Sequence, residues 1–432
     1  MERTTCCVVG GGPAGMMLGL LLARAGVEVT VLEKHADFLR DFRGDTVHPT
    51  TLDLLDDLGL GERFAALPQS RVDEVAFPTE PMRPGAAVGH GPMLRVGDFT
   101  RLAALGVRHP YVAMVPQWDL LDLLADAAGR EPSFTLRMNT EVTGLRRDGE
   151  RVTGVRYRTA DGVEGEIGAT LVVAGDGRTS TARTGVDLPI TEYACPMDVW
   201  WFRLPRHADD TMTALSPRMG DRRFGLLIPR EGYYQVAYMT PPGSDAALRE
   251  RGLEAFRADV AELIPEFADR MDTITSLDEV KLLSVQLNRL RRWHVDGLLC
   301  LGDAAHAMSP LGGVGINLAI QDAVAAATLL AEPLLRGQVT PEELAAVRRR
   351  RVLPTVLVQT LQRVMHRAIL RPVLEGRRSG PPAAVRRLMA AVPPATILPA
   401  YLIGVGFRPE RAPAFARREP EPVPAGAQHP SS

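Results

Sequence analysis

The stretch from Cys6 to Gly15, CCVVGGGPAG, constrains the fold of this chain more than any other. Its first residues, up to Val9, are small or β-branched and apolar, which is typical of a buried strand. Three glycines follow at Gly10, Gly12 and Gly15, with the spacing G-x-G-x-x-G. A strand that runs directly into such a glycine pattern predicts a tight strand–turn–helix unit.

The residues after the glycines complete this unit. A helix is predicted from Pro13 and Ala14 to just before Gly26, because proline suits the first turn of a helix and glycine ends one. A second apolar strand over residues 27–32 ends at the acidic residue Glu33. In this arrangement the helix N-terminus attracts a pyrophosphate, and the acid accepts a hydrogen bond from a ribose. The pattern predicts a dinucleotide-binding domain, and the alternative is a turn that needs glycine only for packing.

Length and charge narrow the class of protein. The chain has 432 residues, of which 45% are hydrophobic, enough for two or three domains. Its formal net charge is −2 without a long basic run, so no electrostatic footprint indicates nucleic-acid binding. The 4 cysteines lack metal-ligand spacing, and no metal site is predicted. The first strand is expected almost at the N-terminus without a secretion signal, which favours a cytoplasmic enzyme.

Residues 388–407 contain no charged side chain, and the segment is long enough to span a bilayer. Three prolines and two glycines interrupt it, so we expect loop and short helix packed on the body, or a dimer contact, and no membrane span. The alternative is a peripheral membrane contact.

The order of predicted elements indicates an α/β fold with a Rossmann-like βαβ domain and a parallel sheet, an inserted antiparallel sheet and a C-terminal helical segment. Short alternating runs over residues 72–98 predict a pair of inserted strands, and longer ones follow over residues 197–240. The predicted division is a dinucleotide domain over 1–71, 99–185 and 281–338, a substrate domain over 72–98 and 186–280, a helical region over 339–408 and a disordered tail over 409–432.

A second motif, Asp176-Gly177-x-x-Ser180-x-x-Arg183, follows the apolar strand predicted over residues 171–174. An Asp-Gly turn at a strand end is common in proteins. The alternative to a binding role is therefore a capped turn with an arginine at the surface.

A third motif is far more specific. Gly302-Asp303 ends another apolar strand, at the lip of a parallel sheet where ligands bind. A run through His306 and Pro310 then leads to glycines before a helix that begins near Asn317. Backbone N–H groups at a helix start favour negative charge, such as that of a reduced flavin. The alternatives are a helix N-cap for Asn317 and a core role for His306.

These three motifs together resemble the signatures of the flavoprotein monooxygenases of the para-hydroxybenzoate hydroxylase class, over about residues 1–335. The resemblance implies tightly held, non-covalent FAD. It places Glu33 at the adenosine ribose, Arg43 and Gln117 along the FAD, and Asp303 at the ribityl chain, and it includes Lys34 among the residues that bind the cofactor. Further implied contacts to FAD come from Gly10, Gly12, Pro13, Ala14, Gly15, Pro310, Gly313, Gly315, Ile316 and Asn317. Asp176 and Arg183 are candidates for contact with FAD or NAD(P)H.

The same resemblance implies the reaction. NADH or NADPH, bound transiently, reduces the FAD, dioxygen forms a C4a-hydroperoxyflavin, and one oxygen passes to an electron-rich aromatic carbon of a phenolic or polyketide-like molecule of secondary metabolism. The alternatives are an epoxidase, a halogenase, an isoprenoid reductase or a non-enzymatic flavin-binding protein. The Trp-x-Trp-x-Ile-Pro signature of related halogenases is not matched at Trp200-Trp201-Phe202. We expect a monomer or homodimer.

The predicted substrate wall is the aromatic-rich sheet, and no general base is assigned. Its candidates share strand faces or face the flavin ring: Trp200, Phe202, Phe224, Tyr234, Tyr238 and Gly312. The alternative is that these aromatic faces are core between the sheet and a helix.

Overall fold

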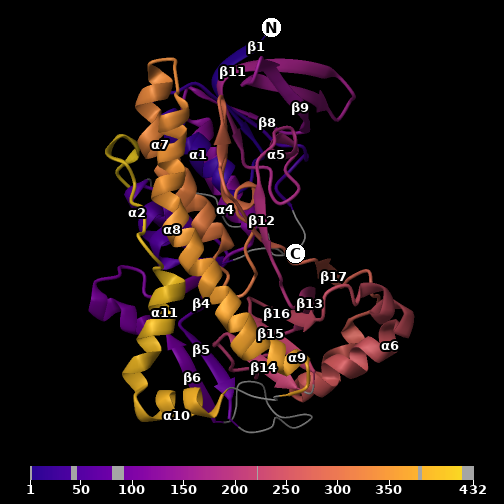
Figure 1. Ribbon diagram of the computed structural model, residues 1–432. Coiled ribbons are helices and arrows are strands. Elements are labelled where there is room, and N and C mark those ends of the chain that lie inside the picture. Colours follow the sequence, from indigo (N-terminus) through magenta and orange to yellow (C-terminus); the bar gives the residue numbers. More distant parts are fainter. Residues whose placement is uncertain (1, 40–45, 80–91, 221, 378–381, 421–432) are drawn as a thin grey trace.

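The computed structural model describes residues 2–39, 46–79, 92–220, 222–377 and 382–420 (Figure 1). An eight-stranded sheet forms the half of the molecule that holds the N-terminus, with the order β19-β20-β11-β1-β2-β8 and with β10 and β9 paired beside β11. Its strands are β1 (Glu2–Val9), β2 (Val29–Leu32), β8 (Phe134–Arg137), β9 (Thr140–Asp148), β10 (Arg151–Thr159), β11 (Glu164–Ala174), β19 (His294–Val295) and β20 (Leu298–Cys300).

The central strands of this sheet are parallel and end in register. Val9 of β1 pairs with Leu32 of β2 and with Ala174 of β11, and Ala174 pairs with Cys300 of β20. The residues that follow these four strands therefore meet at one edge of the sheet. The βαβ unit, the parallel sheet and the inserted antiparallel sheet confirm the predicted fold class.

Three helices pack on the parallel sheet and on its edge. Helix α1 (Pro13–Arg24) begins with proline at its first position and is buried almost throughout, as its sequence predicts. It packs against α4 (Gln117–Gly129) and α7 (Gly315–Leu335). Among the described helices, α7 is long and apolar enough to cross a membrane, but 78% of its apolar window is buried inside the protein. Buried in this way, α7 is a core helix of the fold.

The other half of the molecule is built on an antiparallel sheet with the order β14-β15-β16-β13-β17. One face of this sheet packs on helix α6 (Asp245–Leu263) and on a following 3-10 helix over Pro265–Thr273. The five strands are β13 (Asp198–Pro205), β14 (Ser216–Gly220), β15 (Arg223–Pro229), β16 (Tyr233–Thr240) and β17 (Lys281–Leu283).

Short strands and helices connect the two halves. The strand pair expected within residues 72–98 is present as β5 and β6, which pair antiparallel. The connecting strands are β3 (Thr46–Val47), β4 (Ser70–Val72), β5 (Glu74–Pro78), β6 (Met93–Asp98), β7 (Val112–Met114), β12 (Ile190–Tyr193) and β18 (Leu287–Leu290). The connecting helices are α2 (Pro49–Asp57), α3 (Gly61–Ala65), α5 (Thr181–Thr184) and the 3-10 helices over Phe99–Leu105 and Gly302–Ala304.

The C-terminal region is helical and runs along both halves. Helix α8 (Pro341–Met365) begins with a capping box between Thr340 and Glu343 and extends from the parallel sheet toward the antiparallel one (Figure 1). A π-helical turn over His366–Leu370 continues it. The remaining helices are α9 (Arg371–Leu374), α10 (Ala383–Ala391), a 3-10 helix over Pro393–Thr396, α11 (Ile397–Gly404) and a 3-10 helix over Ala414–Ala416.

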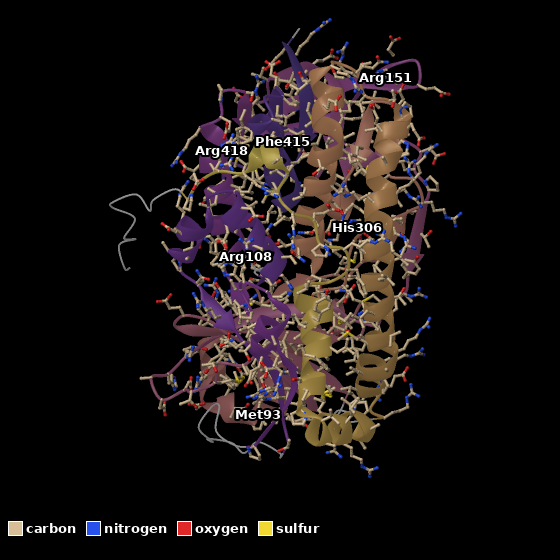
Figure 2. The ribbon with its side chains drawn as sticks, turned by 90° about the vertical axis from the view of Figure 1, so that its left-hand side faces the viewer. Met93, Arg108, Arg151, His306, Phe415 and Arg418 are labelled. Atoms are coloured by element: carbon tan, nitrogen blue, oxygen red, sulfur yellow. The ribbon has the colours of Figure 1, made fainter. Side chains whose placement is uncertain are left out.

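The expected disordered tail is wrong for residues 409–420, which pack on the body. Ala412 and Ala416 are buried, and Arg24 Nη1 donates a hydrogen bond to the Ala416 carbonyl at 2.9 Å. Phe415 and Arg418 lie beside the N-terminal half in Figure 2. Small apolar residues and a buried arginine partner hold a segment whose composition resembles a disordered one. Residues 421–432 lie outside the described chain.

Candidate active site

One cavity of about 1260 Å³ joins the edge of the parallel sheet to the inner face of the antiparallel sheet. It reaches from the glycine turn after β1 to helices α10 and α11. Its size exceeds the roughly 300–1,000 Å³ typical of a pocket for a single drug-sized ligand. The cavity therefore has room for a large cofactor and a second molecule.

The glycine turn fits a pyrophosphate. A Cβ atom built on Gly15 would lie 2.0 Å from the Gly10 carbonyl oxygen, so helix and turn can approach this closely only with glycine at position 15. A Cβ on Gly12 would meet only the Gly175 carbonyl oxygen, at 3.9 Å, and would project into open space. Helix α1 has no side-chain cap, which leaves N–H groups of its first turn available to an anion.

Glu33 lies at the adjacent strand end and lines the cavity with Lys34. Its carboxylate accepts hydrogen bonds from the Gly11 N–H at 2.9 Å and from the His35 N–H at 3.1 Å. The His35 ring nitrogen Nδ1 lies 2.6 Å from the same carboxylate. These contacts hold the Glu33 carboxylate in place at the strand end.

The second motif joins two turns of the site. Ser180 caps helix α5, and its hydroxyl accepts the Arg183 N–H at 2.9 Å. The Arg183 guanidinium donates to the carbonyls of Arg178, at 2.6 Å, and Ala304, at 3.1 Å. Asp176 lines the cavity, and burial raises the pKa of its carboxyl. Arg183 is not among the cavity-lining residues. Its two hydrogen bonds instead link the turn of the second motif to the turn of the third.

Asp303 lies at the predicted strand end, where its half-exposed side chain lines the cavity. Arg178 Nε is 3.9 Å from its carboxylate. Gln117, the first residue of α4, also lines the cavity. Arg43 lies outside the described residues, and its predicted contact stays a prediction.

The loop from Pro310 to Gly315 lines the middle of the cavity and is held from two sides. On one side, Thr46 Oγ1 and His48 Nε2 donate to the Gly313 carbonyl at 2.6 and 3.0 Å. Because a carbonyl only accepts, the Nε2 atom of His48 carries a proton. Burial lowers the pKa of His48, which favours its neutral form.

Helix α8 and the π-helical turn hold the other side of this loop. Gln362 Nε2 donates to the carbonyls of Ser309 and Leu311, at 2.8 and 2.9 Å. Ser309 Oγ lies 2.9 Å from His366 Nε2, and burial lowers the pKa of His366 to about 4. Gln362 and His366 were absent from the sequence-based candidates, because no motif surrounds them.

Asn317 differs from both sequence-based expectations. It is the third residue of α7, where its Oδ1 accepts hydrogen bonds from Thr50 and Thr51 at 3.0 and 2.6 Å. Its side chain therefore joins α7 to α2, and it is neither an N-cap nor a cavity-lining residue. The neighbouring Gly315 and Ile316 do line the cavity.

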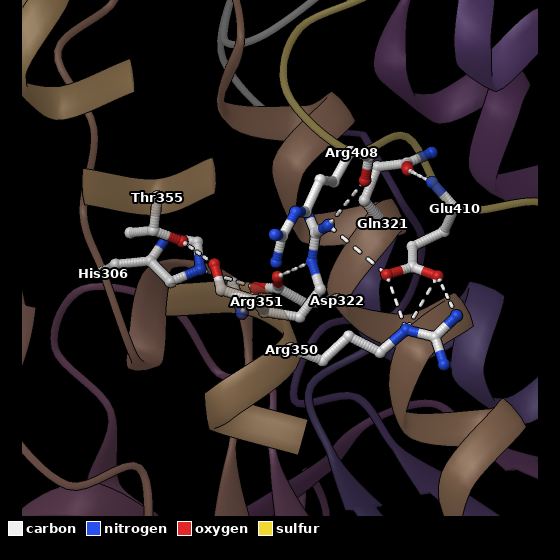
Figure 3. Close-up of polar contacts among 9 residues, drawn as sticks. His306, Gln321, Asp322, Arg350, Arg351, Thr355, Arg408 and Glu410 are labelled. Carbon is white, nitrogen blue, oxygen red and sulfur yellow. Dashed lines mark hydrogen bonds and ion pairs between the residues drawn. The ribbon is translucent and has the colours of Figure 1, made fainter. Parts of the chain in front are cut away.

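His306 has the core role that was the alternative to catalysis. It is 1% exposed, and its Nε2 lies 2.5 Å from Asp322 Oδ2, while Arg351 Nε donates to Asp322 Oδ1 at 3.0 Å. Arg351 and Arg350 both contact Glu410 of the C-terminal segment (Figure 3). Burial alone would raise the pKa of Asp322, but His306 and Arg351 hold it below its usual value.

The predicted substrate wall needs correction, because four of its aromatic residues face away from the cavity. Their side chains pack in the core between the antiparallel sheet and α6, and three of them make ring contacts with Phe256. These four are Trp200, Phe202, Tyr234 and Tyr238. Residues on alternate positions point the other way, so Trp201 lines the cavity in their place, together with Phe224 and Gly312.

Three features together fit the site of a flavoprotein monooxygenase. They are the glycine turn after β1, the acids at the strand ends, and the apolar part of the cavity under the antiparallel sheet, called the chamber below. Residues 3–359 match the family model described as an FAD binding domain, and the chain belongs to this family.

Comparison with known proteins agrees. The chain is 36% identical over 373 residues to 6-methylpretetramide 4-monooxygenase of Streptomyces rimosus, covering 85% of each chain. The OxyS anhydrotetracycline hydroxylase structure from Streptomyces rimosus superposes with a TM-score of 0.70 at 24% identity, covering 94% of this chain and 76% of that one. A probable FAD-dependent monooxygenase of Pseudomonas aeruginosa, pqsL, gives 0.70 at 21% identity, covering 89% and 99%. The protein is an FAD-dependent monooxygenase of the aromatic hydroxylase class.

Proposed function

We propose that this enzyme uses NADH or NADPH and dioxygen to hydroxylate a multi-ring phenolic molecule of the polyketide type. One observation carries the proposal. A single cavity contains both the glycine cradle at Gly12 and a largely apolar chamber under the antiparallel sheet. The name of the 36% identical relative, a 6-methylpretetramide monooxygenase, supports a polyketide-type substrate.

The residues at the parallel sheet edge would hold FAD. The free N–H groups before α1 would bind the pyrophosphate, Glu33 the ribose and Asp303 the ribityl chain. The Pro310–Gly315 loop would face the flavin ring. When bound, FAD supplies the redox chemistry that activates dioxygen for transfer of one oxygen atom.

The chain's own side chains would bind and orient the substrate. The cavity faces of the antiparallel sheet, α10 and α11 are dominated by Trp201, Phe224, Leu226, Met389 and Ile403. Such a wall excludes water and holds a planar aromatic molecule by apolar contact. The chamber places no carboxylate against the proposed substrate position among the described sheet residues, so we assign no general base.

The reductant would bind transiently, since the sequence carries a single G-x-G-x-x-G unit. The same proposal includes a cytoplasmic enzyme that acts as a monomer or homodimer.

The test uses purified, FAD-loaded protein. A flavin absorption spectrum and oxidation of NADH or NADPH that depends on a multi-ring phenol, with one oxygen atom gained in the product, are expected. A protein that cannot be loaded with FAD would contradict the cofactor proposal. Reductant oxidation that yields only peroxide across single-ring and multi-ring phenols would contradict the proposed substrate class.

A further inference from the structure

Strand β16 places its side chains alternately on the two faces of the antiparallel sheet. Tyr234, Val236 and Tyr238 belong to the core against α6, whereas Gln235 and Met239 line the cavity. Met239 belongs to the apolar cluster on which Leu311 of the flavin-facing loop packs. Gln235 is four positions along the strand, roughly 13 Å away at about 3.3 Å per residue.

Gln235 is the one carboxamide on the cavity face of this sheet, within the described residues. The other cavity-lining residues of the five strands are hydrocarbon, thioether or indole side chains: Trp201, Pro217, Met219, Phe224, Leu226, Ile228, Met239, Leu282 and Leu283. A buried amide in such a wall costs free energy unless its donors and acceptor find partners. The amide therefore needs an explanation that packing alone does not supply.

Arg230 supplies the hydrogen-bond partners of the amide oxygen of Gln235. Arg230 and Gln235 are each 3% exposed. Arg230 Nε and Nη2 both donate to Gln235 Oε1, at 3.1 and 2.9 Å. This fork assigns the oxygen of the amide, because a guanidinium can only donate. The Gln235 NH₂ group must then lie on the other side of the amide, and no described residue accepts a hydrogen bond from it.

We propose that the Gln235 NH₂ group donates a hydrogen bond to an oxygen acceptor of the substrate, at the end of the molecule remote from the hydroxylated ring. The inference rests on the proposed function, because it assumes an aromatic substrate in this chamber. It adds a chemical requirement to the substrate class: a carbonyl-type oxygen about as far from the reacting ring as Gln235 lies from Met239. Arg230 acts as the positioning residue that fixes which way the amide faces.

The experiment compares two probes that differ in one atom group. The first is 7-acetylanthracen-1-ol, and the second is 7-isopropenylanthracen-1-ol, in which a methylene group replaces the ketone oxygen. Their dissociation constants are measured by calorimetry with oxidised, FAD-loaded protein and no reductant, so that no turnover occurs. A net hydrogen bond to a buried donor is worth about 0.5–1.5 kcal/mol, so the wild type should bind the ketone roughly threefold to tenfold more tightly.

Two variants separate recognition from structure. Gln235→Glu keeps an acceptor for Arg230 but has no N–H donor, and it should abolish the preference for the ketone. Gln235→Leu should do the same, with the added loss of the Arg230 partner. Gln338→Glu makes the same chemical change at an exposed position after α7 and should keep the wild-type ratio.

The outcomes are distinct. Loss of the ketone preference in Gln235→Glu, with an unchanged dissociation constant for FAD, would support the proposal. A preference retained in Gln235→Glu would show that Gln235 only satisfies Arg230, and would overturn it. Equal affinity of the wild type for both probes would overturn this inference while leaving the proposed function intact. A wild type that binds neither probe would overturn both.

Discussion

The side-chain amide of Gln362 forms hydrogen bonds with both the backbone N–H and the backbone carbonyl of Ser309. Gln362 Oε1 accepts the Ser309 N–H at 3.2 Å, and Gln362 Nε2 donates to the Ser309 carbonyl at 2.8 Å. The two residues lie 53 positions apart in the sequence. A C-terminal helix outside the three sequence motifs therefore holds the loop that would face the flavin.

The first prediction concerns this contact. Gln362→Leu leaves buried groups of the Ser309 backbone unpaired, at about 1–3 kcal/mol each, and frees the loop. Because small misplacements at a reacting centre slow chemistry severely, we expect the turnover number for hydroxylation to fall roughly tenfold to hundredfold. More peroxide should form per NAD(P)H consumed. Gln338→Leu is the control. An unchanged ratio of hydroxylated product to NAD(P)H consumed in Gln362→Leu would contradict the role of the Gln362–Ser309 contact.

The glycine turn gives a second prediction, in which two positions separate folding from cofactor binding. Gly12→Val projects into open space, so the apoprotein should keep its thermal midpoint, while FAD affinity falls about tenfold to hundredfold because overpacking costs about 1–3 kcal/mol. Gly15→Ala meets the Gly10 carbonyl and should lower the thermal midpoint itself. Flavin fluorescence titration and thermal unfolding measure the two effects. Equal loss of stability in both variants would contradict the separate roles given to Gly12 in cofactor binding and to Gly15 in folding.

Neighbouring tryptophans on β13 provide the third prediction. Trp200 is 0% exposed and packs against Phe256, so Trp200→Ala should destabilise the protein by about 3–5 kcal/mol. Trp201→Ala enlarges the cavity and should mainly raise the KM for a multi-ring phenol. Urea unfolding and steady-state kinetics of both variants are the measurements. The opposite pattern would mean that the faces of the strand are assigned the wrong way round.

The pH dependence of stability is the fourth prediction. The pKa of His366 falls from 6.5 to about 4 on folding, because burial disfavours the imidazolium. As pH drops below 6.5, the unfolded chain binds a proton that the folded chain does not, so stability is lost between about pH 6.5 and pH 4. His366→Gln can still bond Ser309 and should flatten this part of the stability curve, measured by urea unfolding at several pH values. A curve identical to the wild type would refute the assignment.

The buried charge network beside the site leads to the fifth prediction. Asp322→Asn leaves the 1% exposed Arg351 with a weakened partner and should cost on the order of 3 kcal/mol. Asp126→Asn weakens the ion pairs of a 52% exposed carboxylate with Arg63 and Arg130 and should cost less than about 1 kcal/mol. Chemical unfolding of both variants provides the comparison. Similar losses would show that the Asp322 network contributes little.

Much of the cofactor end could be predicted from sequence, for a physical reason. The strand, the glycine turn, the helix and the strand-end acid are encoded within one short stretch that ends at Glu33. Asp176 and Gly302-Asp303 follow apolar strands of the same parallel sheet. Parallel strands that end in register bring such residues to one edge, so local patterns were enough to gather them.

The substrate end could not be predicted in the same way. Alternation along β13 and β16 shows that Trp200 shares a face with Phe202, but it does not show which face α6 covers. That choice decides whether Trp200 or Trp201 lines the cavity. The role of Asn317 was likewise unpredictable, because its partners Thr50 and Thr51 come from a helix far away in sequence.

The sequence by itself thus determined the class of cofactor and the sheet edge at which the three motifs meet, because both depend on local turns and on strands that end together. Only the tertiary structure decided which face of the antiparallel sheet became the chamber wall, and that residues 409–420 pack on the body. It also brought Gln362 to Ser309 and aimed Gln235 into the cavity. These features depend on contacts between segments that are far apart in the chain. A local sequence pattern does not show which of those segments pack together.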